Sequence, residues 1–216
     1  NVEPGVTETS ILLKDEVYPV EVTLYFTAFA KENIIKERTE IRHNEKKPVT
    51  LYQYASSLLS MQASKYYMTE FSGEWAHEVN MTEQELSFGK KMVDSGDVLF
   101  GTLAWTGNFR FTFEVDNHNK LRILSGINPY ASEYTLKPGE VFATPEFIFT
   151  YSTEGKGKAS RDFHSWARKY QLKDGEGSRM SLLNNWEATY FDFDETKLGN
   201  LFKEAKHLGV DMFLLD

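Results

Sequence analysis

Apolar and polar residues alternate along the first three quarters of the chain. Between positions 20 and 29, Val20, Val22, Leu24, Phe26 and Ala28 alternate with a more polar set, the period-two pattern of a strand with two different faces. Similar runs occupy residues 34–42, 49–59, 97–105, 109–115, 121–127 and 141–151, and turn-forming residues separate them at 44–48, 106–108, 116–119 and 137–139. Many long strands at this spacing predict an antiparallel β-sandwich.

The period changes from two to that of a helix near residue 159. Phe163, Trp166, Ala167 and Tyr170 recur on one stripe and predict a helix over residues 159–172. A short segment with two glycines, residues 173–178, then separates this helix from the rest of the chain.

The last 36 or so residues have the pattern of a strand, a helix and a second strand. Leu182 and Leu183 begin the first strand, and apolar spacing predicts a helix from about Asp192, with Asp192 and Glu195 as a capping pair and Gly209 as its stop. The apolar run 212–215 predicts a strand buried on both faces, as in a parallel barrel. This is the pattern of the first β-α-β unit of a (β/α)₈ barrel.

Such a barrel needs roughly 250 residues, so we expect the chain to be a fragment of a longer protein. Its first residues, Asn1-Val-Glu-Pro, include neither an initiator methionine nor an apolar signal region. The predicted division is a partial β-sandwich domain over 1–158, a linking helix and linker over 159–180, and a truncated barrel over 181–216.

Composition narrows the choice of partners. A net charge of −8 and a pI near 5.2 argue against a nucleic-acid partner, because binding to phosphates needs clustered lysine and arginine. No apolar run is long enough to cross a membrane. The chain has no cysteine, and its histidines lack metal-ligand spacing, so we expect no metal and no cofactor. A neutral or weakly charged ligand fits better, and the 14 % aromatic content suits both a sandwich core and sugar stacking.

Five sequence blocks occur in an order that one known family shows. They are Phe71-Ser-Gly-Glu-Trp-Ala76, Leu103-Ala-Trp-Thr-Gly-Asn-Phe109, Gly126-Ile-Asn-Pro129, Thr144-Pro-Glu146, and Asn184-Asn-Trp-Glu-Ala-Thr-Tyr-Phe191 followed by Leu214-Leu-Asp216. In these blocks the chain resembles glycoside hydrolase family 36, the α-galactosidases, in which an N-terminal β-supersandwich precedes the catalytic barrel. The resemblance implies a mainly β fold, with this supersandwich, a linking helix and the start of the barrel.

The resemblance also implies a reaction, the retaining hydrolysis of terminal α-linked galactose in oligosaccharides of the melibiose and raffinose type. Asp216 falls on the first aspartate of the family's Asp-Asp-Gly-Trp motif, which binds galactose hydroxyls, and Trp186 falls on a tryptophan that walls the same pocket. A carboxylate that accepts bonds from O4 and O6 rejects sugars that leave it unpaired. Asn185 is a third candidate for substrate binding.

Other interpretations stay open from the residues themselves. Asp216 could cap the turn after its strand, Trp186 could pack under the next loop, and Asn184 and Asn185 could bond backbone at the barrel mouth. The complete protein could instead be an α-N-acetylgalactosaminidase of the same family. From another class, the β part could be a carbohydrate-binding or assembly module with no active site.

Catalysis is expected to belong to the complete protein. Retaining glycosidases use two carboxylates about 5 Å apart, and the resemblance places both aspartates on later barrel strands, so we expect this segment alone to be inactive. The resemblance also implies a homo-oligomer formed through the supersandwich domain. The compartment, cytoplasm or periplasm of a bacterium, stays open.

One departure from the family lies between Ser95 and Gly96. The family carries there a further segment of a few dozen residues with a Ser-His-Gln motif, whereas this sequence runs directly from one flank to the other. Either the protein has a deletion, or the two flanks are ordered parts of a longer chain joined in the sequence. We favour the second interpretation.

Overall fold

The computed structural model describes residues 3–75, 77–86 and 97–216. The chain forms two compact units, residues 1–167 and 168–216, which we describe separately. The Ser95–Gly96 junction, for which the sequence predicts a missing segment, lies outside the described residues.

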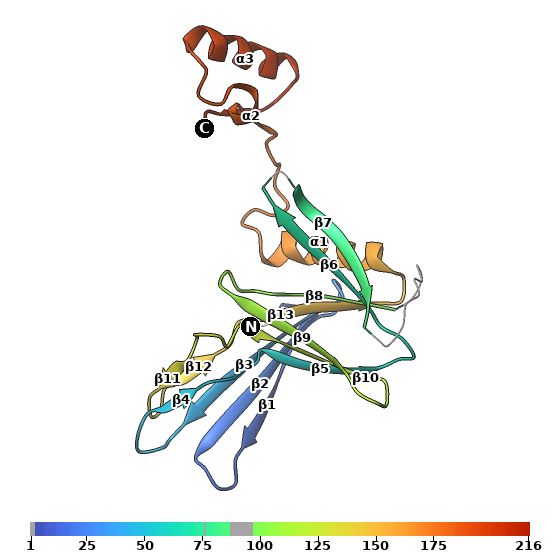
Figure 1. The fold of residues 1–216 in the computed structure, drawn as a ribbon, viewed down its shortest axis with the longest axis vertical. Coiled ribbons are helices and arrows are strands. Elements are labelled where there is room, and N and C mark those ends of the chain that lie inside the picture. Colours follow the sequence, from blue (N-terminus) through green and yellow to red (C-terminus); the bar gives the residue numbers. More distant parts are fainter. Residues whose placement is uncertain (1–2, 76, 87–96) are drawn as a thin grey trace. The chain divides into compact units, whose positions relative to one another are not determined.

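The first unit is built on one large antiparallel sheet, shown in Figure 1. Its order is β1 (Val6–Lys14), β2 (Val20–Phe29), β3 (Ile34–His43), β13 (Phe147–Ser152) and β8 (Val98–Leu103), and β12 (Val141–Ala143) also pairs with β3. β2 and β3 pair over their whole length, from Val20 opposite His43 to Phe29 opposite Ile34. The alternation predicted for residues 20–29 therefore corresponds to a strand inside a sheet.

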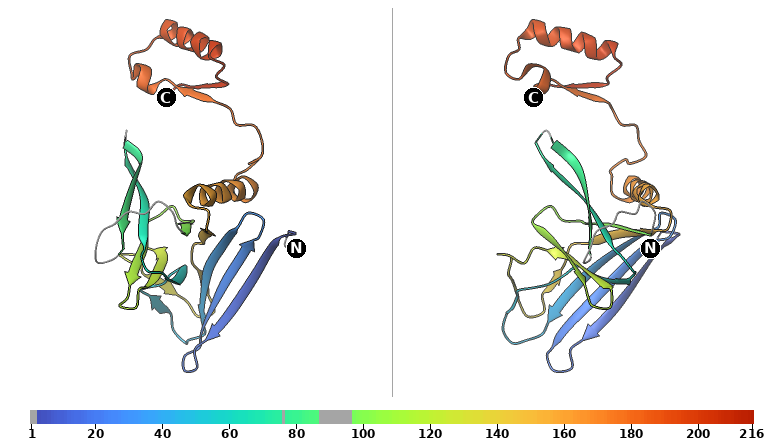
Figure 2. Two further views of the ribbon diagram at one scale, coloured as in Figure 1. Left: turned by 90° about the vertical axis from the view of Figure 1, so that its right-hand side faces the viewer. Right: turned by 45° about the vertical axis from the view of Figure 1, so that its right-hand side comes forward.

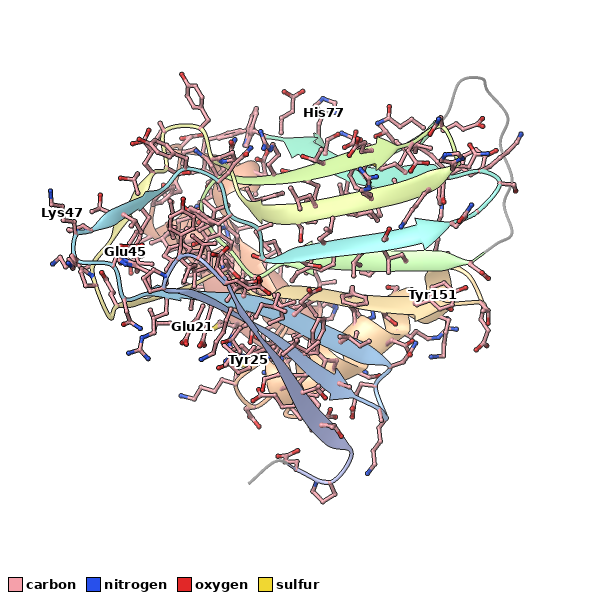
Figure 3. The ribbon with its side chains drawn as sticks, turned by 90° about the horizontal axis from the view of Figure 1, so that it is seen from below. Glu21, Tyr25, Glu45, Lys47, His77 and Tyr151 are labelled. Atoms are coloured by element: carbon pink, nitrogen blue, oxygen red, sulfur yellow. The ribbon has the colours of Figure 1, made fainter. Side chains whose placement is uncertain are left out.

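A smaller sheet forms the second layer, and Figure 3 shows the two layers from below. It contains β5 (Ser57–Gln62), β10 (Lys120–Ile127) and β9 (Phe109–Val115), with β10 in the middle. Two more pairs complete the unit: β4 (Val49–Leu51) with β11 (Tyr134–Leu136), and the hairpin of β6 (Tyr67–Glu74) with β7 (His77–Glu85). The labels mark Tyr25 on β2 and His77 on β7.

The core lies between the two layers. Tyr66, Leu121 and Ile123 are buried at its centre, and the Phe111 ring of β9 meets the Phe147 ring of β13, with ring centroids 5.9 Å apart. Burial of such rings between two sheets is the main stabilising contribution of a sandwich. The fold class predicted from the sequence is confirmed.

Helix α1 (Lys156–Tyr170) packs on the large sheet through two aromatic contacts. Trp166 meets Phe29 edge to face at 5.9 Å, and Phe163 meets Phe100 at 4.8 Å. The helix begins three residues before the predicted start and ends two residues before the predicted end. Its first turn is already closed by the bond from the Ala159 N–H to the carbonyl of Gly155, whose φ of +82° suits a glycine.

Two runs predicted as single strands are each broken in two. The run 49–59 separates into β4 and β5, and the run 141–151 separates into β12 and β13. In the second, Pro145 has no N–H for a ladder bond, and the Thr144 N–H instead bonds to the carbonyl of Thr39. The prediction also missed β1, β6, β7 and β11.

The second unit contains a parallel strand pair and the helix that connects its strands, the red part of Figure 2. β14 (Leu182–Asn184) pairs with β15 (Met212–Leu214), and between them lie α2 (Trp186–Thr189) and α3 (Glu195–His207). The β-α-β pattern predicted from the sequence is therefore confirmed, whereas the short helix α2 was expected as a loop.

Two details of this unit correct the prediction. The N-cap of α3 is Asp194, whose Oδ1 accepts the Lys197 N–H at 2.7 Å, so Asp192 and Glu195 do not form the capping pair. Met212 and Leu214 are 45 % and 46 % exposed, so the second strand is not buried on both faces. The reason is that its sheet has only two strands in the described residues, and α3 covers it through the contact of Phe202 with Phe213.

Candidate functional site

The parallel strand pair brings the candidate residues to one end of the sheet. Asn184 is the last residue of β14 and lies opposite Leu214 in β15. Trp186 follows the first strand by two residues, and Asp216 follows the second by two. Both therefore lie at carboxyl ends of parallel strands, where barrel enzymes place their binding groups.

Asp216 is held through both its backbone and its side chain. Its N–H donates to Asn185 Oδ1 at 2.8 Å, and its carboxylate Oδ2 accepts from Asn184 Nδ2 at 3.0 Å. Within the described residues no other side chain bonds to this carboxylate, which is exposed. A positioned carboxylate with acceptor capacity left over suits a hydroxyl-rich ligand.

Asn185 is almost completely buried, with 1 % of its surface exposed. Its Oδ1 holds the Asp216 N–H, and its Nδ2 donates to Thr189 Oγ1 at 2.9 Å. Both ends of this amide therefore bond to the protein. This geometry matches the interpretation in which the asparagines bond backbone at the barrel mouth.

Trp186 begins α2 and contacts two aromatic rings. Its N–H donates to Asn184 Oδ1 at 2.7 Å, and its indole meets the rings of Tyr190 and Phe191 edge to face at 5.5 and 5.0 Å. Tyr190 has a φ of 48°, rare for a residue with a side chain and typical of functional sites. Sequence reasoning assigned no part to Tyr190 or Phe191, although Tyr190 lies one helical turn after Trp186.

Charge is arranged differently at the two ends of the strand pair. At the candidate end, the Tyr190 hydroxyl donates to Glu187 Oε2 at 3.1 Å, and this bond to a carboxylate raises the pKa of Tyr190. At the other end, the N–H and hydroxyl of Ser181 donate to Asp211 Oδ2 at 2.8 and 2.9 Å, and these bonds lower the pKa of Asp211. Asp211 therefore holds the starts of the two strands together, while Asp216 bonds through its side chain only to Asn184 within the described residues.

The sandwich also has a cleft of its own, with a volume of about 280 Å³. It is lined by Gln53, Tyr54, Ala55, Arg110, Thr112, Leu124, Ser125, Gly126, Ile127 and Pro129. None of these is a carboxylate, so the lining supplies binding groups without an acid/base pair.

The described part of the chain contains neither a cluster of metal-ligating side chains nor a membrane-spanning helix. No group of three or more histidine, aspartate and glutamate side chains there could hold a metal ion. No helix there is long and apolar enough to span a membrane.

Two family models match the chain. The glycosyl hydrolase family 36 N-terminal domain matches residues 1–96 and 92–137, and the melibiase model matches residues 141–216. The two stretches of the first match overlap at residues 92–96, the place where the sequence predicts a missing segment.

Known α-galactosidases resemble the chain in sequence. Alpha-galactosidase AgaA of Geobacillus stearothermophilus is 29 % identical over 95 % of this chain and 32 % of that enzyme. Alpha-galactosidase 2 of Pediococcus pentosaceus is 31 % identical over 98 % of this chain and 32 % of that enzyme. The chain thus spans about a third of the length of these relatives.

The resemblance extends to solved structures. The crystal structure of AgaA has a TM-score of 0.88 at 28 % identity, and covers 98 % of this chain and 33 % of that one. A variant of AgaA crystallised with raffinose has a TM-score of 0.78 at 26 % identity, and covers 99 % of this chain and 33 % of that one.

Proposed function

The chain belongs to glycoside hydrolase family 36, and from this membership we propose that the complete protein is a retaining α-galactosidase that releases terminal α-linked galactose from oligosaccharides. The observation that carries the proposal is the joint placement of Trp186 after β14 and of Asp216 after β15, at the carboxyl ends of the two paired strands. Relatives of the chain are α-galactosidases, and variants of one were crystallised with raffinose and with stachyose. Galactosides of this kind are the proposed substrates.

In the proposed site Asp216 selects galactose. Galactose differs from glucose in its axial 4-hydroxyl, and a carboxylate that accepts bonds from O4 and O6 is left unpaired by sugars without this geometry. An unpaired charge in a closed pocket is costly, so such a contact gives strong discrimination. Trp186 offers an apolar ring face to sugar C–H groups and an N–H donor at its edge.

Asn185 has a supporting part in this proposal. Its buried amide holds the Asp216 backbone and the Thr189 hydroxyl, and neither of its polar ends is left for a sugar in the described structure. We therefore assign substrate contact to Asp216 and Trp186.

Bond cleavage is assigned to residues outside this chain. The two carboxylates of a retaining glycosidase stand about 5 Å apart, and Asn184 and Asn185 are the side chains that bond to Asp216 here. We propose that the catalytic pair lies on later barrel strands, that residues 1–158, 159–180 and 181–216 are supersandwich, linker and start of the barrel, and that the protein assembles into a homo-oligomer through the supersandwich.

The test compares the complete protein with the 216-residue chain. The complete protein should hydrolyse nitrophenyl α-galactoside and release galactose with retained configuration, seen by NMR of the first product anomer. The isolated chain should not exceed a mock-purified control. Preference for nitrophenyl α-N-acetylgalactosaminide would identify the other family activity, and sugar binding without hydrolysis of either compound would identify a binding module.

A further inference from the structure

Asn184 touches both residues to which the proposed function assigns sugar binding. Its Nδ2 donates to Asp216 Oδ2 at 3.0 Å, and its Oδ1 accepts the Trp186 N–H at 2.7 Å. Asp216 lies 32 positions after Asn184 in the sequence, and Trp186 lies two positions after it. One half-buried side chain thus joins the loop after β14 to the residue that follows β15.

The chemistry of the two partners fixes the orientation of this amide. A backbone N–H can only donate, so the atom that faces Trp186 must be the oxygen of Asn184. A carboxylate can only accept, so the atom that faces Asp216 must be the nitrogen. Both contacts are satisfied in one orientation and neither in the flipped one. A hydroxyl is too short to make both bonds, and a carboxylate in this place would repel Asp216.

We propose that Asn184 is a positioning residue that holds the Asp216 carboxylate in a fixed place relative to the Trp186 loop, with one carboxylate oxygen engaged and the other left for the sugar. The proposal rests on the function proposed above, in which Asp216 and Trp186 bind galactose. It assigns to Asn184 no contact with substrate.

Because of the neighbouring asparagine, Asn185, the proposed role of Asn184 can be tested without disturbing the backbone at Asp216. Asn185 holds the backbone N–H of Asp216 at 2.8 Å and is buried, whereas Asn184 holds the side chain. Loss of the Asn184 amide therefore leaves the chain path at Asp216 in place, and frees the Asp216 carboxylate and the Trp186 N–H. Four other titratable groups lie between β14 and α3. Glu187 and Tyr190 bond to each other, Asp192 pairs with the Lys197 ammonium group, and Asp194 caps α3.

The experiment uses Asn184→Ala and Asn184→Asp in the complete protein. The matched control is Asn200→Asp, which makes the same charge change at an exposed position of α3. Nitrophenyl α-galactoside kinetics are measured from acid to alkaline pH, together with thermal unfolding. Asn184→Ala should lower kcat/KM about 10- to 100-fold, the effect of one hydrogen bond to a charged group, with little change in the unfolding temperature.

The pH profile separates positioning from a merely structural effect. In Asn184→Asp at low pH, the new carboxyl keeps a proton and can donate to Asp216 again. At higher pH both groups are charged and repel. Its kcat/KM relative to wild type should therefore fall as pH rises, while the ratio for Asn200→Asp stays flat.

Three results would overturn the inference. The first is an unchanged kcat/KM for Asn184→Ala in a folded protein. The second is a flat pH ratio for Asn184→Asp, and the third is a loss of activity that only follows a loss of folded protein. A wild-type protein without activity on α-galactosides would instead refute the proposed function, and the inference with it. Wild-type activity with normal variants would refute the inference alone.

Discussion

Asp216 donates its backbone N–H to the buried Oδ1 of Asn185 at 2.8 Å, across 31 positions of the chain. The bond closes the ends of β14 and β15 just beyond the point where their ladder stops at Asn184 and Leu214. A ligand-binding carboxylate on an unrestrained stretch of backbone would lose conformational entropy each time a ligand binds. Here a buried amide has already fixed the backbone that carries it.

Asp216→Asn should reduce kcat/KM of the complete protein on nitrophenyl α-galactoside by roughly 30- to 1000-fold, because a charged acceptor becomes a neutral one in the bound state. The fold should persist, since Asn185 bonds to the backbone of this residue. The contrast is Asp211→Asn, which should lower the unfolding temperature, because Asp211 fastens Ser181, and should leave kcat/KM of the folded enzyme near wild type. Unchanged kinetics in the Asp216 variant would identify a turn cap.

Trp186→Ala should raise KM more than it lowers kcat, because a ring face that contacts sugar C–H groups contributes similarly to the ground state and the transition state. Trp186→Phe should recover part of the affinity, since the contacts with Tyr190 and Phe191 need only an aromatic ring. The measurement is the separate determination of kcat and KM. The contrary result is that kcat falls as much as KM rises, and by the same factor in the alanine and phenylalanine variants. It would indicate that the residue only supports its loop.

Much of the architecture follows from local pattern. β9 and β10 alternate in burial because one face of each meets the opposite layer. Both strands, and β2 with its half-buried residues, are predicted close to their observed bounds. β6 and β7 were missed because most of their residues are exposed, so burial gives no period to read. Pro145 marks the break between β12 and β13, but its effect depends on the Thr39 carbonyl in another strand.

The geometry of the candidate site was predictable in part. The placement of Trp186 and Asp216 at one edge could be predicted, because strand, helix and strand follow each other in order and parallel strands end at one edge. The two bonds of the Asn184 amide could not, since the partners of an amide depend on the path of a loop that returns after 32 residues. The Asp194 cap was likewise decided by backbone geometry, with a φ of −133°.

Gly126→Ala should destabilise the sandwich by about 1–3 kcal/mol, the usual cost of overpacking. A Cβ at this position would stand 3.1 Å from Ala55 Cα and 3.3 Å from Ser56 N, which are backbone atoms that cannot turn aside. The control is Gly157→Ala in α1, where a Cβ would meet only the flexible end of Arg161, and where alanine should be neutral or stabilising by up to about 1 kcal/mol. Thermal unfolding of both variants tests this, and equal unfolding temperatures would contradict it.

Glu37→Gln should raise the free energy of unfolding of the complete protein above that of wild type. The gain should be larger at neutral pH than at acid pH. Glu37 lies in β3 with 5 % of its surface exposed, and Ser57 Oγ donates to its Oε2. In the described residues no lysine, arginine or histidine forms an ion pair with it. Burial raises the pKa of Glu37, and the bond from Ser57 opposes this only in part.

A carboxyl with a raised pKa in the folded state keeps its proton there after the unfolded chain has lost it. Its contribution to stability is complete below the unfolded pKa of about 4.3 and is lost as pH rises through the folded pKa. Glutamine cannot ionise, so Glu37→Gln should exceed wild type in unfolding temperature at pH 7, with a smaller difference near pH 4. Glu16→Gln, at an exposed turn, makes the same charge change and should follow wild type at each pH. A difference that is constant from pH 4 to 7, or that shrinks with rising pH, would show that Glu37 is charged in the core and stabilised there.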